Sequence, residues 1–145
     1  MTYNINLPLQ EGWSSEVETL EENGVEITHF QAYLPDNTQQ CDKALIDICA
    51  GPMPEGSDAE SEALESYADV VGYDEDEEEE DPLTVWPFQG KKAFGYEAIC
   101  EDGSPMRVMT VEIIPGVLAV ITVACRDDSL LVSAVKNVEA KLSVI

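Results

Sequence analysis

The sequence is poor in positive charge. Its 145 residues include seven lysines and arginines and one histidine against 30 aspartates and glutamates, which gives a formal net charge of −23. A surface this acidic repels the phosphates of nucleic acids and the headgroups of anionic lipids, and it accelerates encounter with positively charged proteins. We therefore expect neither a nucleic acid nor a membrane as a partner, and a basic protein surface is the partner that the charge favours.

Long apolar stretches are also missing. The longest apolar run, residues 117–125, is shorter than the roughly 20 residues that a membrane-spanning helix requires. Residues 1–8 contain neither the basic nor the apolar segment of a secretion signal. The four cysteines show no CxxC spacing, and a domain of this length needs no disulfides. These absences predict a cytoplasmic protein with reduced thiols.

The usual catalytic and cofactor motifs are absent. The sequence contains no G-x-S-x-G elbow, no phosphate-binding glycine loop and no close Cys/His pairs of the kind that hold zinc. His29, the only histidine, shares its strand face with Val25 and Ile27, so the simplest interpretation is a partly buried strand residue. The alternative is a small Cys/His-dependent hydrolase or transferase that uses Cys49 or Cys125 with His29. We predict a non-enzymatic protein with no catalytic residue, no metal site and no cofactor.

Apolar alternation and turn residues predict a sheet built from hairpins. The clearest signal is Asn23-Gly24, which favours a type I′ turn between strands at 17–22 and 25–33. The run 117–125 is apolar on both faces, which is typical of a central strand that is covered on each side. Further strands are predicted at 3–7, 44–49, 83–88, 92–100 and 106–114.

Two amphipathic helices complete the prediction. Ser57 to Glu60 fits a capping box that begins the first helix, and Asp127 or Asp128 caps the second. The second helix carries an apolar stripe formed by Leu131, Ala134, Val135, Val138, Leu142 and Ile145. We expect a single domain over residues 1–145 of the α+β class: an antiparallel sheet covered by the two helices as a three-layer α/β/α sandwich.

The order of these elements resembles the PsbP-like superfamily, which includes photosystem accessory proteins and yeast Ran-binding factors. The residues that carry the resemblance are Tyr3 to Pro8 followed by Gly12-Trp13, the segment from Gly90 to Gly95, the turn at Pro115-Gly116 and the terminal helix from Asp127. Members are mostly non-enzymatic binding or chaperone-like proteins, and the resemblance implies such a role here. The acidic run from Asp74 to Asp81 departs from the family pattern.

Eight consecutive carboxylates, Asp74 to Asp81, follow the first helix. Unit charges about 4 Å apart repel by roughly 1 kcal/mol even in water, so the run should form a hydrated loop at about 73–82. The run either stays solvated or docks a basic protein surface. Binding of a cation is the third alternative, although the run lacks the spaced ligands of a calcium site. The candidate partner-binding residues are Glu62, Glu65, Asp69, Asp74, Glu75, Asp76, Glu77, Glu78, Glu79, Glu80, Asp81 and Trp86.

These observations favour a binding, adaptor or chaperone-like module for a basic protein partner. A structural domain that pairs with itself through an exposed sheet edge is the remaining alternative, and we expect a monomer or a weak homodimer.

Overall fold

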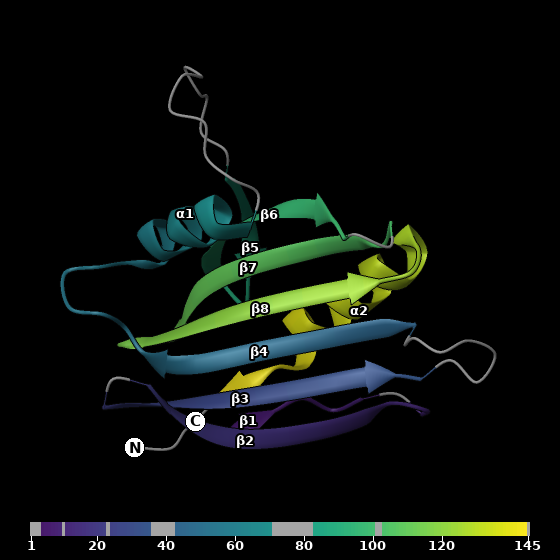
Figure 1. Cartoon of the computed structure of the whole chain (residues 1–145), viewed down its shortest axis with the longest axis horizontal. Helices are drawn as coiled ribbons and strands as arrows, with labels where there is room; N and C mark the ends of the chain where they lie inside the picture. Colours follow the sequence, from purple (N-terminus) through teal and green to yellow (C-terminus); the bar gives the residue numbers. More distant parts are fainter. Residues whose placement is uncertain are drawn as a thin grey trace.

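The computed structural model describes residues 4–9, 11–22, 24–35, 43–70, 83–100 and 103–144. The predicted acidic loop at 73–82 therefore lies outside the described residues. Within them the chain forms nine strands and two helices (Figure 1). Their bounds are β1 Ile5–Asn6, β2 Ser14–Glu22, β3 Val25–Leu34, β4 Ala44–Pro52, α1 Ala59–Val70, β5 Thr84–Phe88, β6 Lys91–Ile99, β7 Pro105–Ile114, β8 Val117–Cys125, α2 Asp128–Lys141 and β9 Ser143–Val144.

Seven strands form one sheet in the order β2-β3-β4-β8-β7-β6-β5, and every neighbouring pair is antiparallel. The β2–β3 hairpin pairs Glu22 with Val25 around Gly24, whose φ of +80° is a conformation that glycine adopts without strain. This confirms the predicted hairpin. As predicted, β8 is a central strand, and β7 reaches it through the turn at Pro115-Gly116.

One face of the sheet carries the main core. Burial alternates strictly along β4 and β8, so every second side chain, from Ala44 and from Val117 onward, points into it. Helix α2 covers this face with Leu131, Ala134, Val135 and Val138 of its predicted apolar stripe, of which Ile145 lies outside the described residues. Asp127 caps the helix by accepting the backbone N–H of Leu130 at 2.7 Å. The helix ends at Lys141, earlier than the stripe suggested, because Leu142 has an extended backbone that leads into β9. Strand β9 then pairs with β1 beside α2.

Helix α1 lies on the opposite face, at the β6–β7 end of the sheet. Its buried Ala63 joins Tyr96 and Val108, which alternate with the core residues of the same strands. The N-cap is Asp58, which accepts the backbone N–H of Ser61 at 2.8 Å, so the helix begins one residue later than the predicted Ser57 cap. The hydroxyl of Ser57 instead donates to the Glu62 carboxylate.

The predicted α+β class is confirmed in its broad form: a mostly antiparallel sheet with two amphipathic helices. The complete cover of both faces that a three-layer sandwich requires is not confirmed. Figure 1 shows α2 behind β8 and β4, whereas no helix in the described part of the chain is drawn in front of β2, β3 and β4. The helices that the structure describes include none with the length and apolar character needed to cross a membrane.

Candidate functional site

We call the side of β2, β3 and β4 that no described helix covers the open face. The residues of the open face alternate along each strand with the core residues. Those on β3 and β4 are half-buried, because each of these strands has a neighbouring strand on both sides. The members of the open face are Glu16, Glu18, Leu20, Ile27, His29, Gln31, Tyr33, Leu45, Asp47, Cys49 and Gly51.

A polar cluster occupies the middle of the open face. The strand register places His29 between Glu18 on β2 and Cys49 on β4. His29 Nε2 lies 2.9 Å from Asp47 Oδ2, and His29 Nδ1 lies 3.5 Å from Glu18 Oε1. Gln31 Nε2 donates to the same Asp47 oxygen at 3.2 Å, and Cys49 Sγ donates to Asp47 Oδ1 at 3.7 Å. The Asp47 carboxylate is therefore the hub of the cluster.

These contacts change the acidity of the two titratable groups beside Asp47. Burial raises the pKa of the Cys49 thiol to about 12, and the negative charge of Asp47 acts in the same direction. Burial lowers the pKa of His29, but the hydrogen bonds and charges of Asp47 and Glu18 together outweigh it and raise that pKa above 6.5. The cluster therefore holds a protonated thiol and an imidazole that binds protons more tightly than usual.

Two hollows adjoin this cluster. One, of about 370 Å³, is lined by Glu16, Val17, Glu18, His29 and Gln31, and its two glutamates make it acidic. The other, which we call the apolar groove, has a volume of about 430 Å³ and a mostly apolar lining. Its lining residues are Val25, Ile27, Cys49, Gly51, Pro52, Met53, Pro54, Glu55, Leu118 and Val120. His29 and Ile27 are two residues apart on the same strand face, so the acidic hollow and the apolar groove are contiguous.

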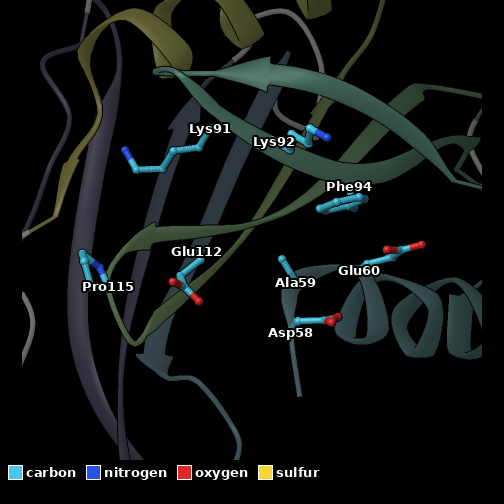
Figure 2. A pocket seen from close by; sticks show the side chains of 8 residues that line it. All are labelled: Asp58, Ala59, Glu60, Lys91, Lys92, Phe94, Glu112 and Pro115. Carbon is cyan, nitrogen blue, oxygen red and sulfur yellow. The ribbon is translucent and has the colours of Figure 1, made fainter. Parts of the chain in front are cut away.

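A further hollow of about 480 Å³ lies between the first turn of α1 and the β6–β7 strands (Figure 2). Figure 2 shows two lysines and an aromatic ring on the β6 side, and carboxylates on the α1 side and near the end of β7. The lining residues are Asp58, Ala59, Glu60, Lys91, Lys92, Phe94, Glu112 and Pro115. Two lysines and three carboxylates line it, so its charge does not favour a ligand of one sign.

The residues predicted to bind a partner are spread over several locations. Glu65 is exposed on α1, and Glu62 is half-buried beside Ser57. The side chain of Asp69 and the whole run from Asp74 to Asp81 lie outside the described residues. Their role stays a prediction.

Trp86, the predicted aromatic anchor, is half-buried on β5 and packs against the main core. The guanidinium of Arg107 lies over its ring, 4.4 Å from the centroid. Arg107 also lies 3.6 Å from the Glu97 carboxylate. One face of the indole is therefore occupied within the protein, which leaves less of it for a partner.

The sequence indicates His29 and Cys49 only as a possible catalytic pair, and Asp47, which contacts both, is not among the residues predicted from it. Cys125 is buried in the core, where burial raises the pKa of its thiol to about 11. Cys49 instead has the opposite strand parity and faces Asp47 and His29. The one available signal was Asp47 within an otherwise apolar strand, because a carboxylate on a strand's second face requires a polar partner.

Comparison of the chain with family models, with curated proteins and with solved structures gives no match. The resemblance to the PsbP-like superfamily therefore stays a prediction.

Proposed function

We propose that this chain is a non-enzymatic binding module whose open face takes a basic, partly apolar segment of a partner protein. One observation carries the proposal: an acidic hollow adjoins an apolar groove on a sheet face that no described helix covers. Lysine or arginine side chains of the partner would lie against Glu16 and Glu18, and its apolar side chains would enter the groove.

The charge of the open face supports a basic partner. Its carboxylates are Glu16, Glu18 and Asp47, and His29 is the one basic residue among its members. The formal net charge of −23 gives the whole molecule a negative electrostatic potential, which steers positively charged proteins toward it. Such steering acts mainly on the association rate and weakens as salt shortens the Debye length to about 8 Å at physiological ionic strength.

Strand β2 disfavours self-association through the sheet edge. It is an edge strand of nine residues, and its side chains from Ser14 to Glu21 are all exposed. Three of these exposed side chains, Glu16, Glu18 and Glu21, are glutamates. Pairing two copies of this edge would bring like charges together, which destabilises a strand pair. A basic segment meets no such penalty.

The cluster gives less support to the alternative of a Cys/His-dependent enzyme. His29 Nε2 is directed at Asp47, and the Cys49 thiol also donates to Asp47. A nucleophilic cysteine requires a lowered pKa, whereas here the pKa is raised to about 12. The arrangement therefore favours binding over nucleophilic catalysis.

Charge reversal on two surfaces tests the proposal. The probe is a synthetic peptide of alternating lysine and leucine, titrated into the ¹⁵N-labelled protein at low and at physiological salt. We expect shifted backbone amide signals on β2, β3 and β4, and an affinity that falls as salt rises. The double variant Glu16→Lys/Glu18→Lys should weaken binding about tenfold or more, because each close pair contributes up to about 1 kcal/mol and reversal adds repulsion.

The matched control carries the same change in charge on α1, in the variant Glu60→Lys/Glu65→Lys, where both native side chains are exposed. We expect this control to retain most of the affinity. If instead the α1 variant, or deletion of residues 74–81, abolishes binding while the β2 variant binds normally, the open face is not the docking surface and the acidic helix and run predicted from the sequence are.

A further inference from the structure

We propose that His29, Asp47 and Cys49 form a binding site for one zinc ion on the open face. Their three potential ligand atoms, an imidazole nitrogen, a carboxylate oxygen and a thiol sulfur, all lie within 4.8 Å of one another. Within the described residues no other group of three such side chains meets this criterion. This inference does not rest on the proposed protein partner, although Glu18 has a role in both.

The sheet holds the three side chains in place. His29 and Cys49 are directly paired on the neighbouring strands β3 and β4, and Asp47 precedes Cys49 by two residues. All three therefore project from the same face, with no loop between them. Both strands lie inside the sheet, with a partner on each side, so the backbone that carries the ligands is fixed.

The ligand types select the metal. A thiolate together with an imidazole and one carboxylate suits zinc, whereas calcium and magnesium take oxygen ligands almost entirely. Zinc binds sulfur at about 2.3 Å and nitrogen or oxygen at about 2.0–2.2 Å in a tetrahedron, so its ligand atoms lie roughly 3.5 Å apart. The three ligand atoms lie within 4.8 Å of one another, so small side-chain movements would bring them to this spacing, and the absence of a described helix over this face leaves room.

A neighbouring carboxylate orients the histidine. His29 Nδ1 lies 3.5 Å from Glu18 Oε1, while Nε2 points to the oxygen of Asp47. In zinc sites the histidine typically donates its second N–H to a carboxylate, which fixes the tautomer that coordinates the metal. Glu18 is thus a positioning residue, and Nε2 is the nitrogen available to the ion.

Three protein ligands leave one tetrahedral position open. The side chains of His29 and Asp47 keep 15% and 27% of their exposure, so water reaches the cluster. Zinc with one carboxylate, one thiolate and a neutral imidazole is electrically neutral, and the thiol proton of Cys49 passes to solvent on binding. The fourth position would hold water or a donor atom from another molecule.

Cobalt(II) provides a direct test, because it substitutes for zinc and its bond to a thiolate gives a charge-transfer absorption. The full chain is titrated with Co²⁺ in an excess of Mg²⁺, which occupies the exposed carboxylates. We expect the charge-transfer absorption to saturate at one Co²⁺ per chain and to be reversed by one equivalent of Zn²⁺. The variant Cys49→Ser should abolish the absorption. The matched control Cys100→Ser, which changes the half-buried thiol directly after β6, should retain it.

One further variant and a measurement of folding separate ligation from misfolding. Glu18→Gln should weaken Co²⁺ binding by about 10- to 100-fold while the absorption at saturation stays the same, as expected for a residue that acts through a ligand. Far-ultraviolet circular dichroism of each variant with a chelator present checks that the sheet is intact.

The proposal is overturned if folded Cys49→Ser gives the same absorption as the native chain. It is equally overturned if the native chain shows no saturable absorption in excess Mg²⁺.

Discussion

Gly95 on β6 has no space for a side chain, and this makes Gly95→Ala the most informative single substitution in the sheet. A Cβ atom built at this position would lie 1.9 Å from the carbonyl oxygen of Val108 and 3.0 Å from Met109 Cα, both on β7. Non-bonded heavy atoms approach one another to about 3.5 Å. The obstructing atoms belong to the backbone and cannot rotate away, so β6 and β7 must separate locally by more than about 1 Å.

The expected cost follows from what this separation breaks. A strand hydrogen bond of about 2.9 Å that lengthens by more than 1 Å is lost, and two such bonds contribute about 1 kcal/mol each. Forcing extra volume into a packed site adds about 1–3 kcal/mol. The cluster of Tyr96 and Val108 under α1 is disturbed as well. We expect the free energy of unfolding to fall by about 3–5 kcal/mol, and the melting temperature by roughly 10–20 °C.

Gly51→Ala is the matched control, since Gly51 is also a strand glycine with no positive φ. Its Cβ would meet the side-chain atom Cγ1 of Ile27 at 3.3 Å, and that side chain can shift. Restricting the unfolded chain offsets this contact by about 0.4–1 kcal/mol. Urea and thermal unfolding followed by circular dichroism compare the two variants. If Gly95→Ala melts within about 3 °C of the native chain, β6 and β7 do not approach as closely as the structure shows.

Three further substitutions test individual contacts. Asp127→Ala removes the α2 N-cap and should lower the free energy of unfolding by about 1 kcal/mol in urea titrations. Hydrogen bonds from the backbone and then the side chain of Ser61 lower the pKa of Asp58. Its stabilising effect should therefore be present above the unfolded pKa of about 3.9 and lost as the pH falls through the folded value, so the melting temperatures of native chain and Asp58→Ala should converge in acid. Arg107→Met removes the cation over the Trp86 ring and should cost about 1 kcal/mol and change the tryptophan fluorescence.

Local signals account for the parts of the fold that the sequence predicts well. Asn23-Gly24 and Pro115-Gly116 each specify a turn within a few residues, and the hairpins around them form as expected. Asp127 caps α2 for the same reason, because the capping interaction spans only three residues. The parity of His29 is equally local, since it follows from alternation along one strand.

The polar cluster depends on information that is not local. Its assembly requires β4 to be the neighbour of β3 and requires the register that pairs His29 with Cys49. Alternation along each strand fixes a face but does not choose a neighbour, and a slip of one residue would place Asp47 in the core. The position of α1 is unpredictable for the same reason. The buried Ala63 of this helix requires apolar cover, but the sequence does not show whether β6–β7 or β3–β4 supplies that cover.

The two proposed uses of the open face are compatible because metal binding changes its charge very little. With a neutral His29, the apo cluster of His29, Asp47 and Cys49 carries one negative charge, that of Asp47. Zinc adds two positive charges and binding releases the Cys49 proton, so the charge rises by a single unit to zero. Glu16 and Glu18 remain to attract a basic segment beside the ion. Zinc should therefore reduce the affinity of a lysine-rich peptide only modestly. If Glu18 instead left His29 and became the fourth ligand of the metal, the affinity for the peptide would fall strongly.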